Sequence, residues 1–283
     1  MKIHNFKYLL LASLAFASCS KEIEEEVVAE VQVSAGTANF SKYVALGNSL
    51  TAGFSDGALF KAGQANSYVK LLADQFASVG GGSFKIPYTN DNVGGLLAGG
   101  TQIPGFGPRL VFNGVGPAPL NAVPTTEIGV PLSGPFNNLG VPGAKVFHLL
   151  APNYGNIANL PTGTANPYFV RFRSAPGTSV INDAMVQQPT FFSLWIGNND
   201  VLGYATAGGD TTNPSNTITP LAGPPGVGFQ ASYETLVNTL TAQGAKGVVA
   251  NIPNVTTLPF FTTVPFNPIT ARLLGQGILQ NGT

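Results

Sequence analysis

The stretch YVALGNSLTAGFSDG, residues 43–57, decides the fold of this chain. An apolar run over residues 42–47 ends at Gly47, and a single hydroxyl follows at Ser49. Short apolar runs that stop at glycine are typical of buried strands. A strand that leaves a serine at its tip can present a nucleophile. The same pattern is also an ordinary strand-to-helix turn, so the rest of the chain must distinguish the two.

A helix is predicted directly after this turn. Ser67 is its expected N-cap and Gly80 its expected C-cap. The spacing places one apolar face on Tyr68, Leu71, Leu72, Phe76 and Val79.

The same order returns later in the chain. Residues 191–196 (FFSLWI) read as a buried strand that Gly197 stops. A helix follows, with Tyr233, Leu236, Val237 and Leu240 on one face, and it ends at Gly244 before a strand over residues 247–252. Strands that alternate with helices predict an α/β fold, a three-layer α/β/α parallel sheet whose ligands bind at the carboxyl ends of the strands.

Residues 85–180 are rich in Gly, Pro and Asn and show little periodicity. A loop of this length in a compact domain is unusual unless it has a function. We therefore expect most of this segment to be a loop-rich insertion at one end of the sheet.

The composition excludes several classes of protein. The 283 residues are 44% hydrophobic and 9% charged, with a formal net charge of +0. Proteins that bind nucleic acid need clustered Lys and Arg, which this sequence lacks, so no nucleic-acid partner is expected. No cluster of His, Cys and carboxylate residues indicates a metal site, and no cofactor is expected.

The N-terminus predicts export. Lys2 and Lys7 precede a short apolar stretch, and small residues lead to Cys19, the only cysteine. This resembles the lipobox of bacterial lipoproteins, with residues 1–18 as the signal peptide; a plain secretory signal is the alternative. The resemblance implies acylation of Cys19, a membrane anchor and a place in the bacterial cell envelope, with the outer membrane favoured. The acidic segment over residues 19–40 is expected to form a solvated tether.

Three polar turns follow strands or lie beside the insertion: GNSLTAG around Ser49, NNLGVPGAKV around Gly143 and WIGNND around Asn199. Ester hydrolysis needs a nucleophilic hydroxyl, a free backbone N–H and an amide donor, and the three turns supply one of each.

These three blocks, in this order, resemble the GDSL or SGNH hydrolase family over residues 41–283, apart from the insertion. The resemblance implies a flavodoxin-like α/β sheet and a serine esterase or acylhydrolase that acts through an acyl-enzyme. It assigns the nucleophile to Ser49. The oxyanion would be held by the N–H groups of Ser49 and Gly143 and by the side-chain amide of Asn199. The substrate would be a lipid, an acetylated glycan or a small ester.

The sequence departs from the family in two places. Asn48 stands where the family usually has Asp, and the family's Asp-x-x-His block is absent. The two histidines are His4, in the signal peptide, and His148, which reads as a structural side chain on a helix. We therefore expect a fragment that is truncated before its catalytic Asp and His and is inactive alone. The alternative is a non-catalytic surface lipoprotein that binds carbohydrate or a partner.

Other polar and aromatic residues near the three turns have ordinary structural interpretations. Asp200 is expected to anchor its own turn, and Asp56 to face solvent. The aromatic residues Phe191, Phe192 and Trp195 are expected to pack in the core.

Overall fold

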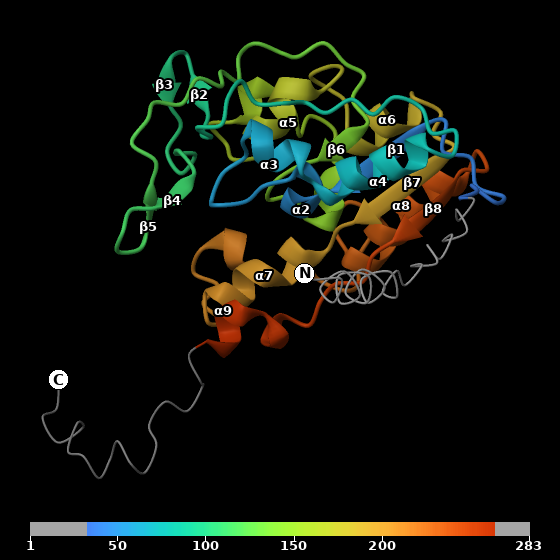
Figure 1. Cartoon of the computed structure of the whole chain (residues 1–283). Helices are drawn as coiled ribbons and strands as arrows, with labels where there is room; N and C mark the ends of the chain where they lie inside the picture. Colours follow the sequence, from blue (N-terminus) through green and yellow to red (C-terminus); the bar gives the residue numbers. More distant parts are fainter. Residues whose placement is uncertain (1–32, 264–283) are drawn as a thin grey trace, which may run out of the picture. The chain divides into compact units, whose positions relative to one another are not determined.

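The computed structural model describes residues 33–263 and shows an α/β fold (Figure 1). The main sheet has four parallel strands in the order β6-β1-β7-β8. Their bounds are β1 Tyr43–Gly47, β6 Asn138–Gly140, β7 Phe191–Trp195 and β8 Lys246–Val249. The chain runs from β1 to its neighbour β6 and then crosses to the other side of β1, where β7 and β8 follow.

The helices connect these strands and cover the sheet. They are α2 Ser49–Ala52, α3 Lys61–Ala65, α4 Tyr68–Ala77, α5 Pro167–Phe172, α6 Val180–Met185, α7 Asn198–Thr206, α8 Phe229–Thr241 and α9 Pro259–Thr262. Four 3₁₀ turns join them: η1 Val146–Leu149, η2 Ile157–Asn159, η3 Pro214–Asn216 and η4 Val255–Thr257.

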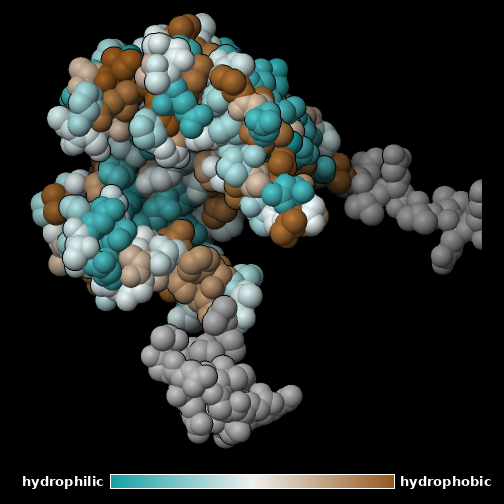
Figure 2. Space-filling model, turned by 90° about the vertical axis from the view of Figure 1, so that its left-hand side faces the viewer, coloured by the Kyte–Doolittle hydropathy of each residue, from teal (hydrophilic) through white to brown (hydrophobic). Residues whose placement is uncertain are grey.

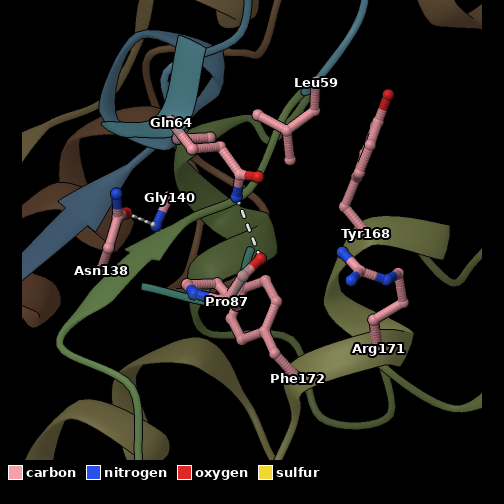
Figure 3. Close-up of a pocket in the computed structure, with 9 residues that line it drawn as sticks. Leu59, Gln64, Pro87, Asn138, Gly140, Tyr168, Arg171 and Phe172 are labelled. Atoms are coloured by element: carbon pink, nitrogen blue, oxygen red, sulfur yellow. Dashed lines mark hydrogen bonds between the residues drawn. The ribbon is translucent and has the colours of Figure 1, made fainter. Parts of the chain in front are cut away.

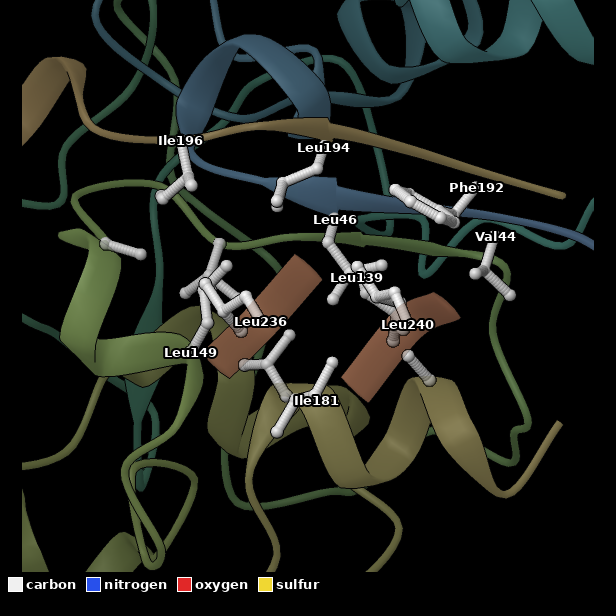
Figure 4. Packing of buried hydrophobic residues seen from close by; sticks show 14 of the residues in the cluster. Val44, Leu46, Leu139, Leu149, Ile181, Phe192, Leu194, Ile196, Leu236 and Leu240 are labelled. Carbon is white, nitrogen blue, oxygen red and sulfur yellow. The ribbon is translucent and has the colours of Figure 1, made fainter. Parts of the chain in front are cut away.

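Alternate residues of β1 face opposite sides of the sheet, as the period of a strand requires. Val44 and Leu46 lie in a cluster with Leu236 and Leu240 of α8 and Ile181 of α6 (Figure 4). On the other face, β1 contributes Tyr43 and Ala45 to a cluster with α4. Helices therefore cover both faces of the sheet, and the predicted α/β class is confirmed.

The predicted apolar face of α8 is confirmed, because Leu236 and Leu240 are buried and Tyr233 and Val237 pack against the core. The predicted face of α4 is wrong in part. Leu71 and Leu72 are exposed, whereas Val69 and Ala73 are buried.

The observed face of α4 packs on aromatic rings of the sheet, since Phe76 meets Tyr43 and Phe191 edge to face in the same cluster as Val69 and Ala73. The expected caps of α4 also need correction. Ser67 occupies the N-cap without a side-chain cap hydrogen bond, and Ser78 rather than Gly80 is the C-cap residue.

Residues 85–180 contribute more to the fold than the sequence indicated. They supply β6 to the main sheet, and they place Phe169 of α5 in the core. They also form two hairpins, β2 Leu97–Ala98 with β3 Thr101–Gln102 and β4 Leu110–Phe112 with β5 Pro117–Pro119. We call β2–β5 the hairpin arm. Its base is fastened near α2, because the Leu110 N–H donates to the Asp56 carbonyl oxygen at 2.6 Å.

The expected signal peptide 1–18, Cys19 and most of the expected tether lie outside the described residues. The last tether residues do not behave as a solvated linker. Phe40 stacks on Phe76 with ring centroids 3.9 Å apart, and Ala38 packs against the same cluster. The folded part therefore begins before residue 41. Among residues 33–263, no helix combines the length and apolarity that crossing a membrane requires.

Candidate active site

The register of the sheet brings the three polar turns to one edge. Gly47 of β1 pairs with Gly140 of β6 on one side and with Trp195 of β7 on the other. The strand order reverses where the chain crosses from β6 past β1 to β7. In open α/β sheets, ligands bind in the crevice outside the carboxyl ends of the strands at such a reversal. The Ser49 and Asn199 turns flank this crevice.

The first turn presents Ser49 at the start of α2. A Cβ at Gly47 would collide with the Thr51 side chain and the Trp195 carbonyl oxygen, so only glycine fits this close approach. The Asn48 side chain caps α2 by accepting the Leu50 N–H at 3.1 Å. Ser49 itself is half-buried. Within residues 33–263, no protein group accepts a hydrogen bond from the Ser49 backbone N–H.

The second turn carries Gly143 and is fastened to the first. The Val141 N–H donates to the Gly47 carbonyl oxygen at 3.0 Å. Val141 lies two residues before Gly143, and Gly47 lies two residues before Ser49. The buried Asn138 side chain donates to the Thr51 carbonyl oxygen at 2.9 Å. Gly143 has φ +81° and is exposed, and its N–H has no protein acceptor in the described part of the chain.

The third turn opens α7. Gly197, with φ +113°, lets the chain turn from β7 into the helix. The Asn199 side chain donates one N–H to the Ala144 carbonyl oxygen at 2.9 Å. An amide nitrogen carries two hydrogens, so one donor of Asn199 is left for a ligand. Asn48 donates to the Asn198 side-chain oxygen at 3.4 Å and so links the first and third turns.

Asp200 has a structural role, but it does not anchor only its own turn. Its buried carboxylate accepts the Val146 N–H at 2.9 Å and so holds the segment that follows Gly143. Burial raises the pKa of this carboxyl group above its ordinary value. Asp56 is exposed, as expected.

Two cavities meet at Asn199. The smaller, about 340 Å³, is lined by Ser49, Asn48, Trp195 and Asn198 together with apolar residues of α7 and of the segment after β8. The larger, about 730 Å³, is lined by Gly143, Lys145 and His148 and by hydroxyl residues around η3. Asn199 and Leu202 line both. Figure 2 shows that the surface is hollowed between the hairpin arm and the α7–α9 segment.

A third cavity lies beneath α2 (Figure 3) and has a different character. Its volume of about 10 Å³ has room for roughly one water molecule. Gln64 and Arg171 line it, and the buried Arg171 guanidinium donates to the Tyr88 carbonyl oxygen at 2.8 Å. It is therefore part of the polar packing under the first turn and cannot hold a substrate.

His148 is a structural side chain in the larger cavity. Its Nδ1 accepts the Lys145 N–H at 3.0 Å, so Nε2 carries the proton of the neutral ring. The ring stacks on Tyr154 with centroids 4.6 Å apart. Burial, with a smaller contribution from Lys145, lowers its pKa to about 4. His148 does not line the cavity that contains Ser49.

The sequence did not predict that Trp195 lines the cavity of the candidate site. Phe191 and Phe192 are buried as expected, but Trp195 ends β7 and lines the cavity beside Ser49. The signal was present, because a residue at the carboxyl end of a strand next to a polar turn is placed to meet a ligand. Asn198 was also overlooked beside Asn199.

Searches of protein-family models, curated proteins and solved structures found no match to this chain. Within residues 33–263, no group of three or more His, Cys, Asp or Glu side chains is gathered as metal ligands would be. The functional argument therefore depends on the geometry of the three turns.

Proposed function

We propose that this chain carries the nucleophile and oxyanion hole of a serine ester hydrolase of the SGNH type. The observation that supports this most directly is the common edge of β6, β1 and β7, from which the turns of Ser49, Gly143 and Asn199 emerge. The N–H groups of Ser49 and Gly143 have no protein acceptors among the described residues, and Asn199 keeps one amide donor. Donors left unpaired in advance are what stabilises a developing oxyanion.

The proposed reaction has two steps. Ser49 Oγ attacks the ester carbonyl carbon while a base takes its proton, and the carbonyl oxygen becomes an oxyanion that the three donors hold. Collapse breaks the ester C–O bond, the alcohol leaves with a proton, and the acyl group stays on Ser49. Water then hydrolyses this acyl-enzyme and releases the carboxylic acid.

The serine needs a base, and His148 is not placed to be one. It lines the other cavity, and its Nδ1 is occupied by the Lys145 N–H. Among the described residues, neither a carboxylate nor a histidine lines the cavity of Ser49. We therefore expect an ester to acylate Ser49 of the 283-residue polypeptide very slowly. An added base should accelerate this reaction.

The test is acylation of Ser49 by p-nitrophenyl acetate with and without imidazole, followed by mass spectrometry of the peptide that contains Ser49. Imidazole should give acetylation at Ser49 that saturates with ester and disappears in Ser49→Ala. Ser78→Ala is the matched control, because Ser78 is an exposed serine at the end of α4.

Absence of Ser49-dependent acetylation at every imidazole concentration would reject the proposal. Rapid acetylation without imidazole would instead show that the chain holds its own base, and His148 would become the candidate.

We further propose, from the sequence around Cys19, that the chain is acylated there and held at the bacterial envelope. Incorporation of labelled palmitate in an expressing bacterium, lost in Cys19→Ser, is the expected result. A secreted, unlabelled product would support the plain signal peptide instead.

A further inference from the structure

The cavity beside Ser49 has an apolar wall. Leu50 of α2 and Leu202 of α7 contribute to it, and so do Ile252, Val255 and Leu258 from the segment after β8. None of its lining residues is charged. Its polar groups lie in the two turns, where Asn48 and Asn198 bond each other. A ligand in this cavity would therefore meet amide and hydroxyl groups near the strand ends and hydrocarbon elsewhere.

The neighbouring cavity differs in both size and chemistry. It is about 730 Å³ and includes Lys145, His148 and the hydroxyl side chains Thr206, Ser215 and Thr217. An ester attacked by Ser49 has two substituents on its carbonyl carbon, an acyl chain and an alkoxy group. Apolar groups bind where they lose water-exposed hydrocarbon surface, and hydroxylated groups bind where hydrogen-bonding partners line the wall.

We propose that the apolar cavity beside Ser49 binds the acyl chain of the substrate, and that the substrate class is short- to medium-chain acyl esters. This assignment rests on the proposed function for the identity of the ligand. The volume of about 340 Å³ is near the lower end for ligand pockets, which matches an acyl group of up to medium length rather than a long lipid chain.

Trp195 makes the cavity observable. It is the only tryptophan of the chain and lines this cavity, with its ring edge to face with Tyr68 at 5.4 Å between centroids. Its fluorescence therefore reports on the surroundings of Trp195, which include this cavity.

The test is titration of the chain with butanoate, hexanoate and octanoate, the straight-chain carboxylates that hydrolysis would release, by Trp195 fluorescence and by calorimetry. Each methylene buried should raise the affinity about fourfold until the cavity is filled. Leu202→Gln should reduce the gain per methylene. Leu71→Gln, on the exposed face of α4, is the matched control and should keep the full gain.

An affinity that does not depend on chain length, or an equal dependence in Leu202→Gln, would overturn the assignment. Leu258→Gln provides a second wall variant should Leu202→Gln fail to fold. The two proposals fail separately. Chain-length-dependent binding without acylation of Ser49 would leave an apolar ligand pocket and reject the hydrolase. Acylation of Ser49 with no preference for chain length would keep the hydrolase and reject the pocket.

Discussion

The Asn199 side-chain amide donates to the Ala144 carbonyl oxygen at 2.9 Å, so the third polar turn is held directly against the second. This bond holds the amide beside Ala144, the residue that follows Gly143. It also fixes the orientation of the amide plane, because the hydrogen that bonds Ala144 determines where the other points. The Asn199 amide is thus oriented by the protein itself before any ligand binds.

Replacing Asn199 by Ala should affect stability and chemistry by different amounts. Loss of one partly buried hydrogen bond lowers the free energy of unfolding by about 1 kcal/mol. Loss of an oxyanion donor lowers the rate of Ser49 acylation in imidazole by about 10²–10³-fold. Urea unfolding and the acylation assay measure the two. Asn238→Ala, at an exposed asparagine of α8, is the control and should lower neither. Equal acylation in Asn199→Ala would remove Asn199 from the oxyanion hole.

Two glycines of the site should lose different amounts of folding stability when each is replaced by alanine. At Gly47 the new Cβ would collide with the Trp195 carbonyl oxygen and Thr51, so we expect a loss of about 3 kcal/mol or more of folding stability. At Gly143 the nearest neighbour is 3.9 Å away, and only the positive φ opposes alanine. That strain costs about 1–2 kcal/mol. Thermal unfolding of both variants tests this order, and a less stable Gly143→Ala would contradict it.

The sequence was sufficient to predict β1, β7 and α8, because each has a clear apolar period and a glycine at its end. It was not sufficient for β6. That strand has three residues, Asn138–Gly140, in a glycine-rich stretch, and it becomes a strand by pairing with β1. The rotation of α4 was missed for a similar reason, since it depends on how the helix packs against Tyr43 and Phe191 of two different strands.

For the site, the residues could be named from the sequence but their contacts could not. Ser49, Gly143 and Asn199 lie in separate turns, and only the strand order places those turns at one edge. The contact of Asn199 with Ala144 and the place of Trp195 in the cavity depend on how α7 leaves β7 through Gly197. Such contacts join segments far apart in the chain, so local spacing carries no signal for them.

The edge strand β8 should make the chain prone to self-association. All four of its residues are exposed, and Val248 and Val249 are 58% and 49% accessible in the described structure. Exposed apolar edge strands are templates for pairing with another chain, and a lysine on the edge opposes this. Val248→Lys should therefore reduce the concentration-dependent growth in particle size seen by light scattering. Leu72→Lys on α4 is the control, and an equal effect there would argue against the strand edge.

His148 should make folding stability fall in mildly acidic solution. Its pKa is lowered from 6.5 to about 4 in the folded chain, so the unfolded chain binds the proton more readily. The contribution is fully present above pH 6.5 and is lost as the pH falls from 6.5 to about 4. The shift corresponds to roughly 3 kcal/mol as an upper bound.

The variant that tests this is His148→Asn, which removes the titrating group and keeps an acceptor for the Lys145 N–H. Urea unfolding from pH 7 to pH 4 should show a steeper loss of stability in the unmodified chain than in the variant. The carboxylates titrate in both proteins, so the difference between the two curves isolates His148. Parallel curves would mean that the imidazole is protonated as easily in the folded chain as in the unfolded one, which its stacking on Tyr154 and its bond to Lys145 oppose.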